Sequence, residues 1–229
     1  MTKFNLSSLL HGHKKVQKAA LLLILVSAFL LTATPAFAHH PLDGKTPSNF
    51  LEGFLSGVAH PIIGLDHFAI VISVGLLAAI HSKGFLIPVS FSLTAMLGTG
   101  AHLAGITVPG IELLVTGSIL LFGLLLVMQD RPNTAILIGL SAIAGLFHGY
   151  AYGEAIFGAA MTPLLAYLAG FTVIQLAVSL GAFLIARSFL PEKAEHSAKL
   201  RSAGFVICGV GLAFFASQLV AVLFPLTNG

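Results

Sequence analysis

The chain has 229 residues, of which 57% are apolar and only 8% are charged. Soluble domains average about a quarter charged residues, so this composition argues against a soluble globular fold. Apolar runs of about 18 residues or more recur along the chain, as they do in proteins that cross a bilayer with helices. The composition therefore predicts an all-α, polytopic membrane protein that contacts the lipid bilayer.

The positive charge lies almost entirely near the N-terminus. The formal net charge is +3, and four lysines fall within the first 38 residues. Beyond residue 38 the chain has 7 Lys and Arg against 8 Asp and Glu, so no basic surface is left for a nucleic acid. Cys208 is the only cysteine, which excludes an intrachain disulfide and a CxxC metal site.

Residues 1–38 have the composition of a signal peptide. A basic stretch ending at Lys18 leads into the apolar run 19–33, and the small-residue pattern Ala36-Phe37-Ala38 follows. This order predicts cleavage after Ala38, which makes His39 the first residue of the mature chain. The basic stretch is long for a signal peptide, so an uncleaved extra helix is the alternative.

The mature chain, residues 39–229, is expected to form one domain of six transmembrane helices. Proline and glycine occur at most of the junctions between the apolar segments, as helix ends require. Only 188–201 is predicted to be a longer polar loop. The expected spans are 55–80, 85–107, 111–128, 134–157, 163–187 and 202–224.

The distribution of Lys and Arg predicts the orientation. With the mature N-terminus outside, the loops after the first, third and fifth spans face the cytoplasm, and both termini are external or periplasmic. The external side then holds only Lys45, as the positive-inside bias of plasma (inner) membrane proteins requires. The cytoplasmic side holds Lys83, Arg131, Arg187, Lys193, Lys199 and Arg201.

The first apolar segment is too long for a single straight span. Residues 50–80 would extend about 46 Å as a helix, whereas the hydrocarbon core is about 30 Å thick. We expect a break at Pro61 or Gly64, with 50–60 forming a short external or re-entrant helix.

Ionisable residues within the spans are the candidates for function, because each costs free energy to bury in a membrane. With the predicted topology they all fall in the outer part of the spans. Imidazole together with carboxylate suits divalent ions such as Ni²⁺, Co²⁺, Zn²⁺ and Cu²⁺. The residues are Glu52, His60, Asp66, His67, His102, Glu112, His148 and Glu154.

These candidates differ in how well packing alone explains them. His60, Asp66 and His67 fall within eight residues, and packing does not explain three such costly groups so close together. The two histidines would share one face if the helix continued through Pro61. His148 lies in mid-span, so its partner must come from another helix. Glu52 is expected at the interface, His102 could simply bond a neighbouring helix, and Glu112 could be a first-turn acid favoured by the helix dipole.

Three glycines recur at every fourth position around His148. Gly145, Gly149 and Gly153 form a small-xxx-small stripe, which lets another helix approach closely. A similar pair, Gly53 and Gly57, precedes the first histidines.

Two motifs resemble signatures of the HupE/UreJ family. Residues 60–67 read H-P-I-I-G-L-D-H, similar to the family's H-x5-D-H. Residues 147–154 read F-H-G-Y-A-Y-G-E, similar to F-H-G-x-A-x-G-x-E. The family's common pattern places the acid one residue later, where this chain has Ala155, and one residue turns a side chain by about 100° around a helix.

The resemblance implies a permease for nickel or cobalt that serves hydrogenase or urease maturation and moves the ion toward the cytoplasm. Carried over by motif, the metal-handling residues are His60, Asp66, His67 and His148, to which we add His39, His102, Glu112 and Glu154. Ni²⁺ or Co²⁺ is then cargo, and no prosthetic group or enzymatic activity is expected. No Walker A sequence occurs, so a secondary transporter is predicted.

Other functions stay open on the sequence alone. A membrane haem protein could use two of the histidines as axial ligands. An intramembrane metal-dependent hydrolase could use the same His and Asp residues, although it lacks H-E-x-x-H. A non-transporting hydrogenase or urease assembly factor is a further alternative. Nickel versus cobalt, the driving force, the pathway served and a homo-oligomeric state are not determined by the residues.

Overall fold

The computed structural model of the chain describes residues 45–189 and 197–224. The predicted signal peptide, His39 and Lys193 lie outside these residues. Throughout the described part the secondary structure is helical, which confirms the all-α prediction. The elements are α2 (Phe50–Ile63), α3 (Leu65–Ala78), α4 (Leu86–Leu103), α5 (Ile111–Val127), α6 (Thr134–Tyr152), the short 3-10 helix η1 (Gly153–Ile156), α7 (Met161–Phe189) and α8 (Ala198–Leu223).

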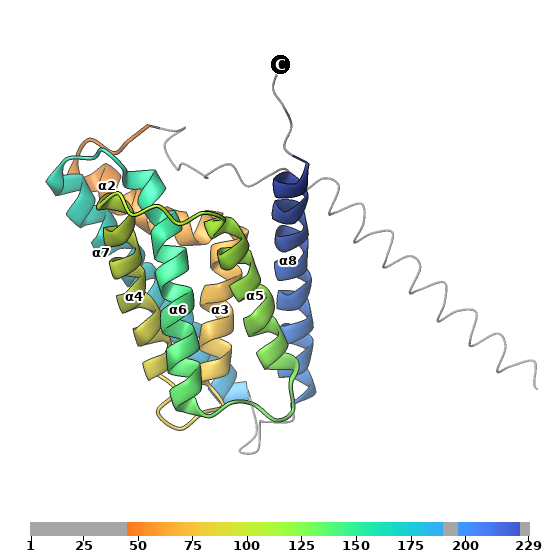
Figure 1. The fold of residues 1–229 in the computed structure, drawn as a ribbon. Helices are drawn as coiled ribbons and strands as arrows, with labels where there is room; N and C mark the ends of the chain where they lie inside the picture. The colour runs from red at the N-terminus through yellow and green to blue at the C-terminus, as the bar shows by residue number, and fades with distance from the viewer. Residues whose placement is uncertain (1–44, 190–196, 225–229) are drawn as a thin grey trace, which may run out of the picture.

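The helices form a bundle with α3 at its centre. Helix α3 contacts α2, α4, α5, α7 and α8, and its side chains Val71, Val74 and Leu77 are almost completely buried. Around it, α4 packs along α6, α5 along α8 and α2 along α7. Figure 1 shows α2 at one end of the bundle, turned away from the direction of the other helices.

The first apolar segment is broken as expected, and the break is at Gly64. Helices α2 and α3 meet there at an angle of 78°. Pro61 lies inside α2, and the last turn closes with the Gly64 N–H donating to the carbonyl of His60 at 3.2 Å. Proline supplies no N–H for the helix ladder, which weakens α2 one turn before the bend.

Local sequence explains where α2 begins. The Asn49 side chain accepts a hydrogen bond from the Glu52 N–H at 3.0 Å, and the Ser48 N–H donates back to the Glu52 carboxylate at 2.8 Å. The Glu52 carboxylate thus reaches the residue before the N-cap, and the two bonds fix the first turn of the helix in the manner of a capping box. Glu52 therefore has a structural role at the start of α2.

Several predicted boundaries are wrong. Helix α8 begins at Ala198 and α7 continues to Phe189, so 188–189 and 198–201 of the expected loop are helical. The second expected span, 85–107, is shorter than predicted because α4 ends at Leu103. The fourth expected span does not continue as α-helix to residue 157, because α6 ends at Tyr152 and tightens into η1.

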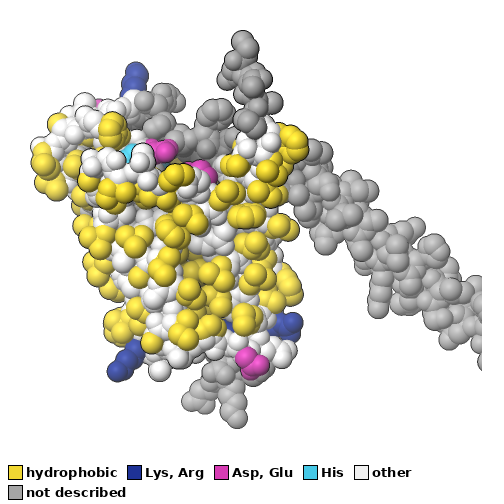
Figure 2. Space-filling model, viewed as in Figure 1, with side chains coloured by type: hydrophobic (Ala, Val, Ile, Leu, Met, Phe, Trp, Pro, Cys, Tyr) yellow, Lys and Arg dark blue, Asp and Glu magenta, His cyan; other side chains and the backbone are white. Residues whose placement is uncertain are grey.

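Among the described residues, four helical stretches are long and apolar enough to cross a membrane: α4, α7, α8 and the continuous stretch of α6 and η1. The bent pair α2–α3 would make a fifth, and α5 is a shorter apolar helix of 17 residues. Figure 2 shows hydrophobic side chains covering the flank of the bundle, with charged side chains gathered toward its two ends. This arrangement fits a multi-pass membrane protein; the count of six stays a prediction.

The predicted glycine stripe on α6 does receive another helix. A Cβ atom at Gly145 would collide with the backbone of Phe91, and one at Gly149 with the backbone of Ala95. Both contacts come from α4, which therefore lies directly against α6. The stripe fixes the position of His148, which stands on α6 between these glycines.

Candidate functional site

The residues of the two motifs meet inside the bundle. The Nδ1 atoms of His67 on α3 and His148 on α6 lie 2.8 Å apart, within hydrogen-bond distance. His148 is completely buried and His67 is 8% exposed. The sequence predicts that His148 takes its partner from another helix, and that partner is His67.

Ser118 on α5 fixes which nitrogen of His148 carries the proton. The Ser118 hydroxyl donates to the carbonyl of Val115 at 2.7 Å, so its oxygen is left to accept from His148 Nε2 at 3.0 Å. A neutral His148 with its proton on Nε2 has a lone pair on Nδ1. That lone pair faces His67, which donates its own Nδ1 proton in this arrangement. A neighbouring hydroxyl thus sets which nitrogen of His148 has a lone pair available.

Asp66 and His60 lie beside this pair, at the bend between α2 and α3. The Asp66 carboxylate accepts a hydrogen bond from the backbone N–H of His67 at 2.8 Å, and only 5% of Asp66 is exposed. The rings of His60 and His67 are 5.3 Å apart between centroids. The two rings meet across the bend at Gly64, not along one face of a continuous helix as the spacing suggested. The bend itself brings the motif together.

Aromatic side chains enclose the histidines. Tyr152 packs edge-on against both His60 and His67, with ring centroids 5.0 and 4.6 Å away. Phe91 on α4 lies against His148, with centroids 5.7 Å apart. Tyr167 on α7 contacts His60 and donates its hydroxyl to the backbone carbonyl of Tyr152 at 3.0 Å. This shell excludes bulk water from the pair and holds the rings in place.

His102, Glu112 and Glu154 lie outside the histidine cluster. They are at the end of the bundle where α4 ends, α5 begins and η1 lies. Glu112 is half-buried in the first turn of α5 and is close enough to Asp66 and Glu154 to interact with both electrostatically. His102 packs against Tyr150, with ring centroids 4.7 Å apart. In the face shown in Figure 2, His and most Asp and Glu side chains lie at this upper end, and most Lys and Arg side chains lie at the lower end.

The described residues contain no group of three His, Cys, Asp or Glu side chains that already converge on one ion. The structure brings His67 and His148 into contact and places His60 and Asp66 next to them. A further ligand has to come from a shift at the bend or from water. His39 lies outside the described residues.

Sequence reasoning missed three polar residues near the site: Ser118, Tyr152 and Gln175. All three are buried, and Gln175 and Tyr152 are completely so. They were missed because only ionisable residues were considered within the spans. A lone amide or hydroxyl in an apolar helix carries a burial cost of the same kind, and applying that test would have found them.

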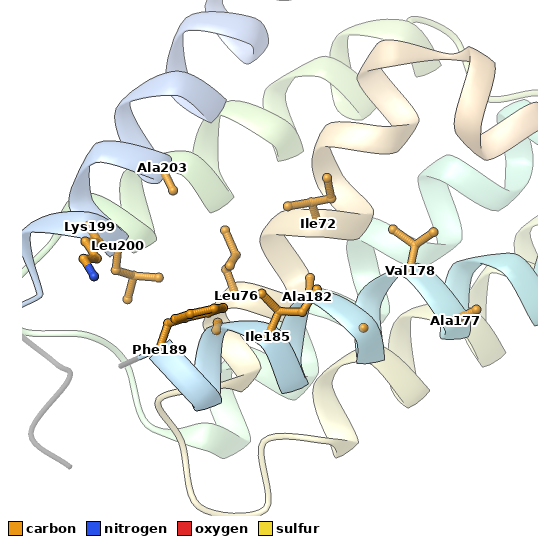
Figure 3. Close-up of a pocket in the computed structure, with 12 residues that line it drawn as sticks. Ile72, Leu76, Ala177, Val178, Ala182, Ile185, Phe189, Lys199, Leu200 and Ala203 are labelled. Carbon is orange, nitrogen blue, oxygen red and sulfur yellow. The ribbon is translucent and has the colours of Figure 1, made fainter. Parts of the chain in front are cut away.

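A large apolar cavity lies elsewhere in the bundle. It has a volume of about 540 Å³ and opens on the flank between α3, α7 and α8. Figure 3 shows Ile72, Leu76 and Ile185 among its lining residues, with Lys199 at one end. None of the candidate site residues lines this cavity, so it offers the ion no ligands.

Comparison with known proteins agrees with the two motifs. The model of the family described as HupE / UreJ protein matches residues 27–214 and so includes both. The chain belongs to the HupE/UreJ family. The protein HupE of Rhizobium leguminosarum bv. viciae is 30% identical over 125 residues, which cover 52% of this chain and 63% of that protein. The match thus spans less than two thirds of that relative. No solved structure matches the chain.

Within the HupE/UreJ signature, the structure separates the two positions that could carry the acid. Glu154 is exposed in η1, whereas Ala155 next to it is 5% exposed and packs in an apolar cluster with Tyr152 and Tyr167. An acid at position 155 would be directed into the bundle, and Glu154 is directed out of it. In this chain the carboxylate therefore lies at the same end of the bundle as Glu112.

Proposed function

We propose that this protein is a secondary transporter that takes up Ni²⁺ or Co²⁺ across the plasma membrane through a site made by His60, Asp66, His67 and His148. The observation that carries the proposal is the close pair of Nδ1 atoms of His67 and His148. Membership of the HupE/UreJ family supports it, because both residues stand in the family's motifs. The transported ion is cargo, not a resident cofactor.

The spacing of the two nitrogens suits a shared metal ion. Imidazole nitrogens bind divalent transition metals at about 2.0–2.1 Å, so two ligands at a right angle on one ion stand about 3 Å apart. The observed separation is 2.8 Å. An ion can therefore replace the shared proton at an almost unchanged separation of the two nitrogens, with each ring turning so that its lone pair points at the ion. His67 then carries its proton on Nε2 in place of Nδ1, which keeps both ligands neutral.

The bend at Gly64 is the point where the site could change shape. His60 lies on α2 and His67 on α3, so a change in the 78° angle alters the distance between their rings. Asp66, in the first turn of α3, would move with His67. Rocking of α2 against α3 would let His60 and Asp66 join the pair and later release the ion.

The proposed topology has six spans, a cleaved signal peptide and both termini outside. In this orientation the acidic outer end, with Glu112 and Glu154, faces the external solution and attracts divalent cations. His39 and His40, outside the described residues, would add a first collecting point at the mature N-terminus.

The test is uptake of ⁶³Ni²⁺ and ⁵⁷Co²⁺ into cells that express the protein, compared with His67→Ala and His148→Ala at equal membrane levels. His81→Ala is a matched control, since His81 lies in the linker between α3 and α4 at the opposite end of the bundle. Uptake of one ion, lost in both site variants and kept in the control, establishes the transporter and names its metal.

An absence of uptake of either ion, with the protein correctly inserted, would contradict the proposal. A haem protein or a non-transporting assembly factor would then become the leading candidate. An absorbance scan near 400 nm on the purified protein identifies the haem alternative.

A further inference from the structure

One face of α7 runs from the histidine cluster toward the opposite end of the bundle. Tyr167, Phe171, Gln175 and Ser179 occur at every fourth position, so they share this face, and each is at most 2% exposed. Gln175 is unusual among them. Both its Nε2 and its Oε1 are buried, and neither has a hydrogen-bond partner of good geometry among the described residues.

Tyr152 connects Gln175 to the histidines. Its ring packs against His60 and His67, and its hydroxyl is close enough to the Gln175 side chain for the two to interact. The Tyr152 hydroxyl is also buried without a hydrogen bond of good geometry. Two side chains from different helices thus place three unsatisfied polar atoms beside the candidate metal site.

Gln175 lies about one helical turn beyond the histidines. Helices α3 and α7 run in the same direction here, because His67 and Phe171 both adjoin Tyr152 while Gly75 contacts the backbone of Ser179. Gln175 is one turn before Ser179, so it stands between these two levels.

A third unsatisfied group lies at a similar depth on α4. The Ser92 hydroxyl is buried and has no hydrogen-bond partner within the part of the chain that the structure describes. Ser92 follows Phe91, which contacts α6 at Gly145, about one turn before His148. The unsatisfied groups on α4 and α7 therefore both lie on the side of the histidines that faces away from the acidic outer end.

Buried polar groups without partners are costly, and in an apolar helix a leucine would fit the same space without that cost. Their concentration beside the histidines indicates a polar ligand. We propose that the Gln175 carbonyl oxygen and the Tyr152 hydroxyl oxygen form a second station, which receives the divalent ion with its remaining water from the histidines on the way inward. This inference rests on the proposed transport function.

The chemistry of the donors gives the station its role. Imidazole is a better ligand for Ni²⁺ and Co²⁺ than a neutral amide or hydroxyl oxygen. A transported ion has to be bound firmly enough to be collected and weakly enough to be released. Histidines followed by neutral oxygen donors provide two sites whose affinity for the ion decreases along its path inward.

The test uses Gln175→Leu, with Tyr152→Phe as a milder second variant that removes one hydroxyl. The matched control is Ser141→Ala, because the buried Ser141 hydroxyl is already satisfied by the carbonyl of Ile87. Three quantities are measured for each protein in full-length form: the maximal rate and KM of Ni²⁺ uptake, Ni²⁺ binding by calorimetry, and the thermal unfolding temperature.

We expect Gln175→Leu to lower the maximal uptake rate about 10-fold or more while Ni²⁺ binding at the histidines is kept. Its unfolding temperature should rise, because an unsatisfied polar group has been replaced by an apolar one of similar size. Tyr152→Phe should lower the rate less, and Ser141→Ala should leave it unchanged.

Two results would overturn the inference. Wild-type uptake rates in both Gln175→Leu and Tyr152→Phe would show that the oxygens do not handle the ion, while transport itself stands. Slower uptake accompanied by a lower unfolding temperature would give Gln175 a structural role only. If the wild-type protein neither binds nor transports Ni²⁺, the proposed function fails first and this inference fails with it.

Discussion

The two ends of the bundle satisfy their buried polar groups in different ways. Toward the end that holds Ala78 and Phe189, the hydroxyls of Ser73, Ser90 and Ser141 donate to backbone carbonyls, either in their own helix or across the contact between α4 and α6. At the level of His67 and His148, by contrast, side chains of different helices bond one another, from His67 to His148 and from His148 to Ser118. A serine satisfied by a backbone carbonyl fits almost anywhere in a span, whereas an imidazole does not. Bonds between polar side chains of different helices are therefore the better marker of the site.

The helices around the histidines are also placed precisely. Close helix approaches at glycine occur along α6 near His148 and along α2 near His60, and they recur further along the bundle at Gly75 and Gly123. The flank near Phe189 differs, because it has a cavity of about 540 Å³ between α3, α7 and α8. Displacing a helix should therefore affect the histidines more than a change beside this cavity.

The largest effect is expected from breaking the tight packing at Gly149. Gly149→Ala puts a methyl group into the backbone of Ala95, which should cost about 1–3 kcal/mol of stability and displace His148 enough to reduce uptake. Gly139→Ala on the same helix is the control, because nothing lies within 4 Å of that position. Thermal unfolding in detergent and Ni²⁺ uptake are measured for both. Equal stability of the two variants would contradict the packing described here.

A smaller effect is expected from Ser118→Ala. This change removes the acceptor for the Nε2 proton of His148, so the lone pair on Nδ1 is no longer held toward His67. We expect Ni²⁺ affinity, measured by calorimetry, to fall about 10-fold while the protein stays folded. An unchanged affinity would mean that Ser118 does not orient the ligand.

Glu154→Gln should change uptake only a few-fold. Glu154 is exposed at the end of the bundle that the proposed topology places outside, so its charge would act by attracting cations and is screened by salt. We expect the KM of the variant to exceed that of the wild-type protein at low ionic strength, and this difference in KM to shrink at high ionic strength. The maximal rate should be the same in both proteins. A large loss of maximal rate would instead place the Glu154 carboxylate on the ion.

The smallest effect is expected from Ser73→Ala at the opposite end. The Ser73 hydroxyl only donates to the carbonyl of Ile70 within α3, and that carbonyl remains in the helix ladder when the hydroxyl is removed. Stability should change by less than about 1 kcal/mol, and Ni²⁺ uptake should not change. Lost uptake in this variant would show that a hydroxyl bonded only within its own helix also matters for transport, which would contradict the comparison made above.

The sequence by itself determined the helical class, most helix limits, the break in the first apolar segment and the two histidine motifs. These features depend on local properties: run length, glycine and proline at helix ends, and the cost of an ionisable group in an apolar run. The glycine stripe on α6 was recognisable for the same reason, because spacing along a helix fixes a shared face.

Only the tertiary structure decided which groups meet. The bend at Gly64 brings His60 to His67, and the packing of α6 against α4 and α5 places His148 where its side chain reaches His67. Ser118 and Gln175 joined the site through contacts between helices that are far apart in the chain. Residue types and spacing indicate which polar groups are costly to bury. The partner that offsets this cost depends on how the helices pack.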